Sequence, residues 1–313
     1  MDIFIEDQVY SPNNIIKNKI TGLKEVSLTV KREDLLHTEV SGNKFRKLKY
    51  NIRSARELGF STLLTFGGAF SNHIAATAAA GRLCGFKTIG VIRGEELGMD
   101  IKSTLSSNPT LRFAHEQGMQ LRFVDRESYR LKDQTEFIDR LESEIGSFYL
   151  IPEGGSNTLA IKGCEEILSE DDKKYDFICC SAGTGATAAG LINSISDDQR
   201  VLVFSALKGD FLKAEITKYT TKRNWQLITD YCFGGYGKIN AELIEFMNSF
   251  KKEQHFLLDP VYTGKMIFGI FDLIKKDYFP VGSKILAIHT GGLQGVPGMN
   301  LLLEKKGLPL IDL

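Results

Sequence analysis

Short apolar runs alternate with amphipathic stretches along the whole chain. One amphipathic stretch has apolar residues at helical spacing, at positions 45, 48, 52, 55 and 58. Regular alternation of strands and helices is typical of βαβ units and of mostly parallel sheets. The apolar runs predict strands at residues 26–30, 61–66, 87–92, 120–124, 148–152, 177–181, 201–207 and 284–289.

The number of predicted strands indicates more than one lobe. Eight strands in 313 residues exceed a single compact Rossmann unit, and a chain of this length can bury a large core. Neither an internal repeat nor a long Gly/Pro linker marks a simple boundary. We therefore predict an α/β fold of two interleaved lobes, each a mostly parallel twisted sheet flanked by helices.

Charge and composition exclude several classes of protein. The chain carries 39 basic and 39 acidic residues, which provides no basic field for nucleic acid and no polybasic tail for a membrane surface. The N-terminal segment lacks the basic start and apolar core of a signal peptide, and no apolar run is long enough to span a bilayer. The five scattered cysteines fit reduced, buried packing residues, and the five histidines lack metal-ligand spacing. These features predict a cytoplasmic protein.

Ligands in such folds bind at the carboxyl ends of the strands, so the turns that follow strands are the places to look for chemistry. The turn 181-SAGTGATAAGL-191 follows a predicted strand and opens an Ala-rich helix, where backbone N–H groups can converge on an anion. The same turn matches a relaxed dinucleotide fingerprint, but Leu207 and Lys208 stand where a ribose-binding acid is expected. A phosphate monoester site is therefore favoured. A turn that only allows close packing is the remaining alternative.

Three further turns contain polar side chains at strand ends. In 66-FGGAFSNHIAATAAAG-81, Ser71 or Asn72 can cap a helix or hold a carboxylate in a cleft. His73 is better explained as a satisfied polar residue than as a base. The other two turns are 259-DPVYTGKMIFG-269 and 289-HTGGLQG-295, and both place hydroxyl groups beside glycines.

A lysine-rich helix start completes the set of candidate groups. In 41-SGNKFRKLKYN-51 we predict that Asn43 caps a helix, which puts Lys44 in its first turn, where the helix dipole and burial both lower the pKa of an amine. Lys47 lies one turn further and can supply an auxiliary charge, whereas Lys49 is predicted to project into water. An anion-binding turn, one neutral lysine and several hydroxyls are what pyridoxal 5'-phosphate requires.

Five segments resemble, in the same order, the D-cysteine desulfhydrase and 1-aminocyclopropane-1-carboxylate (ACC) deaminase family: residues 41–51, 71–73, 181–187, 259–265 and 289–292. The members of this family are pyridoxal-phosphate enzymes with a tryptophan synthase β-like fold, called fold type II. The resemblance implies a homodimer that acts on a small amino acid. It also implies a large cofactor-binding domain, residues 1–43 and 156–313, and a small inserted domain, residues 44–155.

The resemblance implies a role for each matching residue. Lys44 would bind the cofactor covalently, Asn72 would contact its 3′-oxygen and Thr290 would lie beside the pyridine nitrogen. Ser71 would contact the substrate carboxylate, with Asn72 and His73 beside it. The two active-site tyrosines would be Tyr236 and Tyr262. The phosphate would be held by backbone amides of Ala182, Gly183, Thr184, Gly185, Ala186 and Thr187.

Some positions differ from the family pattern. Ser41 replaces a glycine, Lys49 replaces a glutamate, and Phe70 replaces a glutamine next to the expected carboxylate site. Thr263 and Thr290 stand where ACC deaminases have Glu and Leu. Hydroxyl partners would favour a neutral ring and a weaker electron sink, so β-elimination from D-cysteine is expected to be easier than opening a cyclopropane.

Several alternatives stay open at this stage. Within the class, they are ACC deamination to 2-oxobutyrate and another amino-acid lyase or racemase reaction on the same fold. A nucleotide-binding oxidoreductase would use residues 183–188. A catalytically silent protein would keep the fold and the cofactor without turnover.

Overall fold

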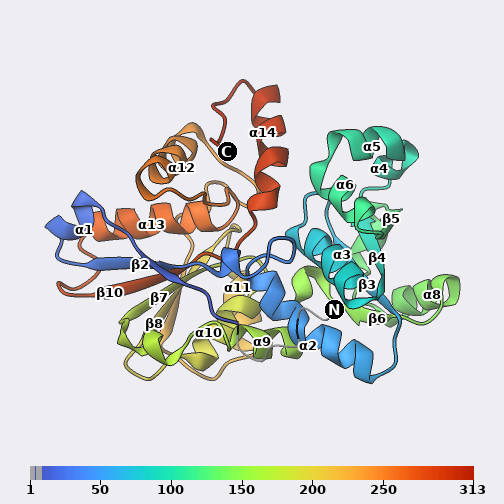
Figure 1. Cartoon of the computed structure of the whole chain (residues 1–313), viewed down its shortest axis with the longest axis horizontal. Helices are drawn as coiled ribbons and strands as arrows, with labels where there is room; N and C mark the ends of the chain where they lie inside the picture. The colour runs from blue at the N-terminus through green and yellow to red at the C-terminus, as the bar shows by residue number, and fades with distance from the viewer. Residues whose placement is uncertain (1–3, 5–8) are drawn as a thin grey trace.

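The computed structural model describes residue 4 and residues 9–313, and in them the chain forms two sheets (Figure 1). The larger sheet has six strands in the order β1-β2-β10-β7-β8-β9, and the smaller has four in the order β5-β4-β3-β6. Only the β1–β2 pair is antiparallel among the pairs of described strands. The strands are β1 Asn13–Ile15, β2 Ser27–Lys31, β3 Thr62–Gly67, β4 Lys87–Arg93, β5 Gln120–Val124, β6 Tyr149–Ile151, β7 Phe177–Ala182, β8 Arg200–Ser205, β9 Trp225–Ile228 and β10 Lys284–Ile288.

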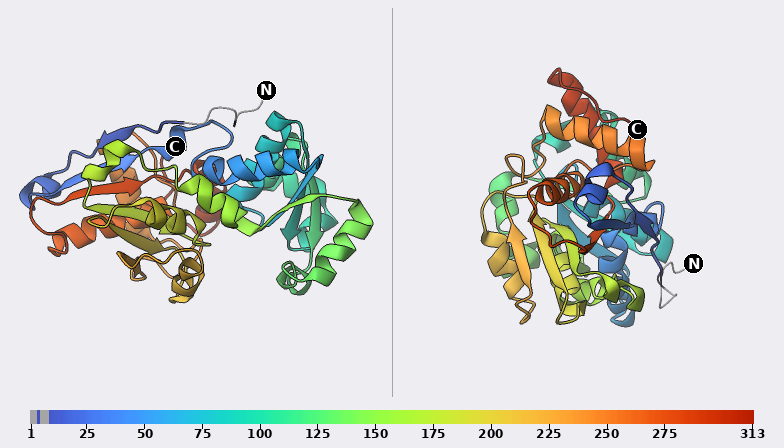
Figure 2. Two further views of the ribbon diagram at one scale, coloured as in Figure 1. Left: turned by 90° about the horizontal axis from the view of Figure 1, so that it is seen from below. Right: turned by 90° about the vertical axis from the view of Figure 1, so that its left-hand side faces the viewer.

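Helices pack around both sheets, and α2 and α9 lie between them (Figure 2). The α-helices are α1 Lys19–Leu23, α2 Asn43–Glu57, α3 Asn72–Cys84, α4 Glu96–Met99, α5 Ile101–Ser107, α6 Pro109–Glu116, α7 Arg126–Arg130, α8 Thr135–Ile145, α9 Thr158–Cys164, α10 Ala186–Ser194, α11 Phe211–Thr217, α12 Ala241–Gln254, α13 Thr263–Lys275 and α14 Val296–Lys305. The short 3-10 helices are η1 Glu33–Leu35, η2 Glu153–Gly155, η3 Glu170–Lys174 and η4 Leu293–Gly295.

Both faces of the larger sheet are buried, which explains why its strands are continuously apolar in sequence. Side chains of a strand alternate between faces, so neighbours along β7 belong to different cores. Cys179 packs into a cluster with α12 and α13, whereas Ile178 and Cys180 pack into a second cluster with α10. The sheet is therefore a central layer between two groups of helices.

The predicted α/β class and the eight predicted strands are confirmed, with shifts of one or two residues at the ends. The sequence analysis missed β1 and β9, which are short strands at the two edges of the larger sheet. The smaller sheet lies wholly within residues 44–155, the range expected for the inserted domain, and the limits of the two domains stay a prediction.

Two expectations about the start of α2 are wrong. Lys49 does not project into water: its side chain is only 2% exposed, and its Nζ lies 2.7 Å from a Glu166 carboxylate oxygen. Asn43 does not cap the helix, because Gly42 occupies the N-cap and Asn43 is the first helical residue. Contacts between α2 and α9, which the periodicity of α2 alone cannot reveal, cover the face that carries Lys49.

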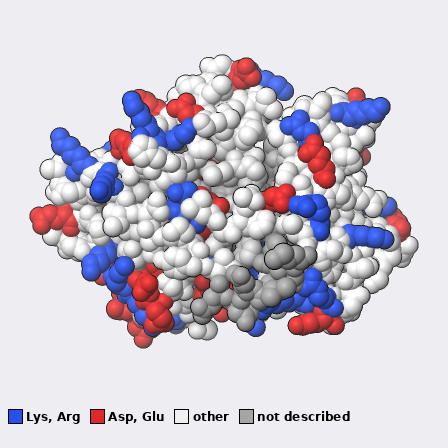
Figure 3. All heavy atoms as spheres, viewed as in Figure 1, with Lys and Arg blue, Asp and Glu red and all other residues white. Residues whose placement is uncertain are grey.

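The cysteines differ in part from their prediction, and the surface charges are mixed. No disulfide bond joins cysteines within residues 9–313, and Cys84 and Cys232 are only partly buried, contrary to expectation. Basic and acidic side chains are intermixed on the face shown in Figure 3. No helix in residues 9–313 is both long enough and apolar enough to cross a membrane. Residues 1–3 and 5–8, part of the segment expected not to be a signal peptide, lie outside the described residues.

Candidate active site

A cavity of about 470 Å³ lies between the two sheets, where the carboxyl ends of their strands meet. Nearly all of the predicted site residues line it, although they come from six separate segments of the chain. Ala186 is the one predicted residue that does not line the cavity. The predicted residues that do are Lys44, Ser71, Asn72, His73, Ala182, Gly183, Thr184, Gly185, Thr187, Tyr236, Tyr262 and Thr290.

The Lys44 amine is fixed by the contact between the start of α2 and the turn after β10. The Asn43 backbone N–H donates to the Thr290 carbonyl at 3.2 Å. Gly42 has a φ of +64°, and a Cβ at this position would lie 2.0 Å from the same carbonyl oxygen, so only glycine fits. This close approach places Lys44 in the first turn of α2 and directs it into the cavity.

The surroundings of the partly buried Lys44 side chain shift its amine toward the neutral form. Burial, followed by the neighbouring Lys47 charge, lowers the pKa of Lys44 well below its usual value. A neutral amine is the form that attacks an aldehyde and that can accept a proton. The predicted chemical state of Lys44 therefore agrees with the structure, although burial, rather than the helix dipole, is the main cause.

Lys47 lies beside Lys44 and faces the turn after β7. Its Nζ donates to the Gly154 carbonyl at 3.0 Å and lies 3.5 Å from the Thr184 hydroxyl oxygen. Burial lowers the pKa of Lys47 as well. Its position at the anion-binding turn supports the auxiliary role expected of it, which stays a prediction.

The turn between β7 and α10 is an open anion site. The N-cap is Gly185, with a φ of +86°, and no side chain caps the helix, so its first N–H groups point toward the cavity. The Asn43 Nδ2 donates to the Thr187 hydroxyl at 2.8 Å and ties this turn to α2. The uncapped N–H groups can hold a phosphate monoester.

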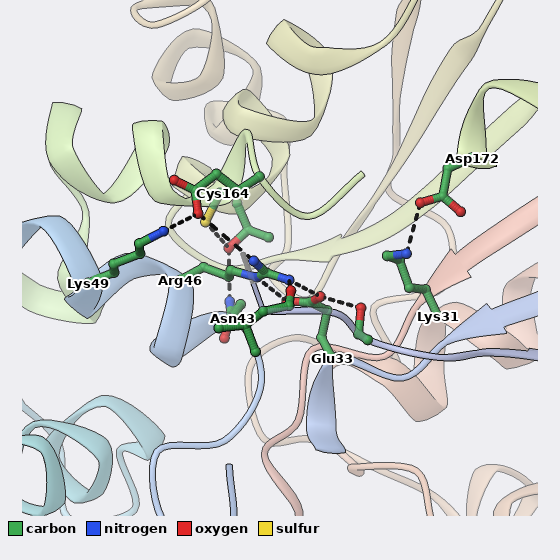
Figure 4. Close-up of polar contacts among 11 residues, drawn as sticks. Lys31, Glu33, Asn43, Arg46, Lys49, Cys164 and Asp172 are labelled. Atoms are coloured by element: carbon green, nitrogen blue, oxygen red, sulfur yellow. Dashed lines mark hydrogen bonds and ion pairs between the residues drawn. The ribbon is translucent and has the colours of Figure 1, made fainter. Parts of the chain in front are cut away.

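A network of buried charges beneath α2 fixes the same region (Figure 4). Arg46 forms a two-pronged ion pair with Glu33, with both donor–acceptor distances at 2.9 Å. On the neighbouring face of α2, Lys49 reaches Glu166, just beyond the end of α9. These pairs hold α2 against the end of α9 and against η1, the short helix between β2 and α2 that carries Glu33. The position of Lys44 therefore depends on them.

The start of α3 supplies polar groups on the opposite wall of the cavity. Ser71 is the N-cap and accepts from the Ile74 N–H at 3.3 Å, which confirms the capping role considered for it. The Asn72 Oδ1 is buried and has no hydrogen-bond partner among the described residues. An acceptor left in this state is suited to a donor group on a bound molecule.

His73 differs in part from its prediction as a satisfied polar residue. Its Nε2 lies 2.8 Å from the Thr65 hydroxyl, but its Nδ1 has no partner among the described residues. Burial and the charges of Lys44 and Lys47 lower the pKa of His73 well below its usual value. His73 is therefore a neutral imidazole close to the two lysines.

Two tyrosines line the outer part of the cavity. The rings of Tyr236 and Tyr262 meet edge to face with their centroids 6.1 Å apart. Tyr262 is the N-cap of α13, whereas Tyr236 belongs to the glycine-rich loop 232–238. Loss of surrounding water raises the pKa of Tyr262 strongly and also raises that of Tyr236, although Tyr236 is 50% exposed, so both phenols stay protonated and can donate a proton.

Thr263 does not line the cavity, so the expectation that its hydroxyl is a partner of the cofactor ring is wrong. Its hydroxyl donates to the Asp259 carboxylate at 3.0 Å, and its side chain is fully buried outside the cavity lining. Asp259 also accepts from the backbone N–H groups of Tyr262 and Thr263 and so caps α13. Thr290 is thus the only one of the two threonines that can contact a ring in the cavity.

The cavity also contains residues that the sequence analysis did not identify. Arg93 and Glu153 line it, as does Gln294, which follows the turn after β10. Arg93 ends β4, and its place at the carboxyl end of a parallel strand was the signal that could have found it. Phe70 also lines the cavity and packs against Gly298 of α14.

These features fit pyridoxal phosphate. The cavity contains a lysine, Lys44, whose pKa is strongly lowered, an uncapped helix start for a phosphate, and an unpartnered Asn72 acceptor. The fold and the site together define a pyridoxal-phosphate enzyme of fold type II. Residues 15–291 match the pyridoxal-phosphate dependent enzyme family, and the chain belongs to that family.

Relatives with assigned names confirm the resemblance found in the sequence. A Pyrococcus horikoshii protein named a putative ACC deaminase is 32% identical over 286 residues, which cover 85% of this chain and 84% of the relative. An Arabidopsis thaliana protein named a bifunctional D-cysteine desulfhydrase/ACC deaminase, mitochondrial, is 31% identical over 91% of this chain and 77% of its own length. The chain therefore lies in the ACC deaminase and D-cysteine desulfhydrase group.

Solved structures support the same conclusion. The crystal structure of an ACC deaminase homologue superposes on this chain with a TM-score of 0.78 and 30% sequence identity. The superposition covers 94% of this chain and 93% of the homologue. A pyridoxal-phosphate-dependent aspartate racemase shares the fold alone, with 16% identity and a TM-score of 0.64 over 90% of both chains. The predictions of fold, cofactor and enzyme class are confirmed.

Proposed function

We propose that this enzyme deaminates a small amino acid, with pyridoxal phosphate bound covalently to Lys44. The observation that supports this most directly is the strongly lowered pKa of the Lys44 amine in the cavity, beside the uncapped turn after β7. Lys47 is the other lysine that lines the cavity. Its Nζ donates to the Gly154 carbonyl at 3.0 Å and lies 3.5 Å from the Thr184 hydroxyl oxygen, whereas the Lys44 Nζ reaches only the Gly154 carbonyl, at 3.5 Å, which favours Lys44 for the covalent role.

The other residues of the cavity would hold the cofactor and the substrate. Backbone N–H groups of residues 182–187 would bind the phosphate, with Asn72 at the 3′-oxygen and Thr290 beside the ring nitrogen. Ser71 and the first N–H groups of α3 would bind the substrate carboxylate, because the positive end of a helix favours an anion. The bound cofactor would withdraw electrons from the substrate carbon atoms.

The protein side chains would move the protons. The lowered pKa of Lys44 favours the neutral amine, which can accept a proton from a substrate carbon atom. The hydroxyls of Tyr262 and Tyr236 stay protonated, so either can donate a proton to a leaving group or to a carbanion. The buried wall around Lys44 and His73 would keep water from the reacting carbon atom.

The names of the relatives make ACC the first substrate to test. Relatives from Pyrococcus and Thermotoga are named putative ACC deaminases, a Rhizobium relative is named an ACC deaminase, and the Arabidopsis relative is named for both reactions. D-Cysteine is the second candidate, supported by the Thr290 hydroxyl in place of leucine. Thr290 is the only support for D-cysteine from these two positions, because Thr263 lies outside the cavity.

Product analysis separates the two reactions. The purified holoenzyme would be incubated with ACC, D-cysteine and L-cysteine, and ammonia, 2-oxobutyrate, pyruvate and sulfide would be measured. ACC deamination gives 2-oxobutyrate and ammonia, whereas β-elimination from cysteine gives pyruvate, ammonia and sulfide. Lys44→Ala should abolish either activity. If cofactor-loaded protein releases no ammonia from any of these or other small amino acids, the proposal is wrong and the catalytically silent alternative is favoured. A cytoplasmic homodimer stays a prediction.

A further inference from the structure

Arg93 is a cation of the cavity wall that the proposed function leaves without a role. It is the last residue of β4 and lines the cavity. Its guanidinium carbon lies 5.7 Å from the centre of the Tyr129 ring. A Cβ on Gly68 would lie 3.7 Å from its Nη2 atom, so the guanidinium lies beside the turn that leads to Ser71.

Arg93 shares the cavity with the two tyrosines, Tyr236 and Tyr262. Burial raises the pKa of Tyr236, the nearby Glu153 carboxylate adds to that rise, and the Arg93 charge opposes it. Arg93, at the end of β4 in the smaller sheet, and Tyr236, in the loop 232–238 after β9 of the larger sheet, line the same cavity. A substrate side chain that extends from Ser71 toward the tyrosines would pass Arg93.

The neighbouring charges are already paired. Glu153 accepts a hydrogen bond from the Tyr129 hydroxyl at 2.8 Å, and the Lys132 Nζ lies 3.5 Å from its other oxygen. Lys47 is turned away, toward Gly154 and the turn after β7. Within residues 9–313, no carboxylate lies within 4.0 Å of the Arg93 guanidinium. Arg93 therefore offers the cavity a cation that is not neutralised by a direct protein partner.

We propose that Arg93 binds a second anionic group on the substrate, at the end of its side chain. This inference rests on the proposed function and narrows it to small amino acids whose side chain is negatively charged or loses its leaving group as an anion. A planar guanidinium binds carboxylate and similar oxyanions through two parallel hydrogen bonds. The side chain of ACC is a neutral ring, whereas the sulfur of cysteine leaves as a thiolate, so the inference favours the second candidate.

Aspartate and asparagine test the inference, because they have nearly the same shape and differ in side-chain charge. Both enantiomers of each would be titrated into the holoenzyme, and binding would be followed by calorimetry and by the visible absorbance of the cofactor. We expect aspartate to bind about tenfold more tightly than asparagine in the preferred enantiomer. Arg93→Gln should bring the ratio of the aspartate and asparagine affinities close to one, whereas Arg93→Lys should keep part of the preference for aspartate.

Arg126→Gln is the matched control. Arg126 lies in α7, is paired with Glu96 and is exposed outside the cavity, so its variant should keep the wild-type ratio. Equal binding of aspartate and asparagine by the wild type would overturn the inference. A preference for aspartate that survives in Arg93→Gln would also overturn it, as would binding of ACC without either probe. If no amino acid binds to the cofactor-loaded protein, the proposed function itself is wrong, and the inference falls with it.

Discussion

The Lys49 Nζ lies 2.7 Å from the Glu166 carboxylate, and the Lys49 side chain is only 2% exposed. Glu166 also receives the Tyr50 hydroxyl and lies 4.0 Å from Arg46, so one carboxylate just beyond α9 holds three side chains of α2. The segment that carries the candidate catalytic lysine is therefore fixed from its opposite side by charge pairs.

Loss of this contact should destabilise the fold. We expect Lys49→Met to lower the free energy of unfolding by about 1–3 kcal/mol, because the partly buried Glu166 loses a close cation while its other donors remain. Lys173→Met, at an exposed pair with Glu170, should change it by less than about 0.5 kcal/mol. Urea unfolding of the two variants would measure both effects. Equal stability of the two variants would contradict this prediction.

Lys44 should reduce the stability of the cofactor-free protein. The pKa of Lys44 is lowered in the folded state, so the unfolded chain binds more protons between that pKa and about 10.4. Lys44→Met should therefore stabilise the cofactor-free protein at pH 7, by about 1.4 kcal/mol for each unit of the lowering that lies above pH 7. This advantage should shrink as the pH is raised toward 10, because the unfolded lysine then also loses its proton.

Thermal unfolding of cofactor-free Lys44→Met and wild type at several pH values would measure this effect. Lys275→Met, at an exposed lysine in the last turn of α13, is the control and should not reproduce the pH trend. A wild type more stable than Lys44→Met at pH 7 would show that the amine is not penalised by burial.

Lys265 should control the position of Tyr236. Its Nζ donates to the carbonyls of Cys232 and Gly235, both at 2.8 Å, inside the loop that carries Tyr236. This loop has positive φ at four residues, Phe233, Gly234, Gly235 and Gly237, so it needs such contacts to keep its shape. We expect Lys265→Met to destabilise the fold by about 1–3 kcal/mol and to lower kcat about tenfold.

A double variant distinguishes positioning from general damage. If Lys265 acts through Tyr236, Lys265→Met should lower kcat little further in a Tyr236→Phe background. Full additivity of the two losses in kcat, measured at a temperature where all variants are folded, would contradict the positioning role.

Gly163 should not tolerate alanine, although alanine usually favours a helix. Gly163 lies in α9, and a Cβ at this position would be 1.9 Å from the Arg46 carbonyl oxygen of α2. We expect Gly163→Ala to lower the free energy of unfolding by more than about 2 kcal/mol, because two helices must separate. Gly22→Ala in α1, where no atom lies within 4 Å, should instead stabilise the protein by about 0.5–1 kcal/mol. Chemical unfolding of both variants checks the opposite signs.

Local sequence was sufficient for the strands, the turns and most of the candidate site. The strands of a buried parallel sheet are apolar on both faces. The strands 177-FICCS-181 and 284-KILAIH-289 can therefore be predicted from their own residues, without knowledge of their neighbours. The glycine-rich turns that follow them are equally local, because a close approach of backbone to backbone requires glycine. Since strand ends meet at one edge of a sheet, these turns could be assigned to one site before any contact was known.

Only the tertiary structure decided which charges are buried and what they contact. The periodicity of α2 predicted an exposed Lys49, but α9 and the residues after it cover that face and provide Glu166. In the same way, Arg93 becomes part of a site only because β4 ends beside a cavity whose other walls come from segments far apart in sequence. A side chain's direction follows from its own helix or strand, but its surroundings depend on whichever distant element packs against it, and short-range sequence patterns do not contain that information.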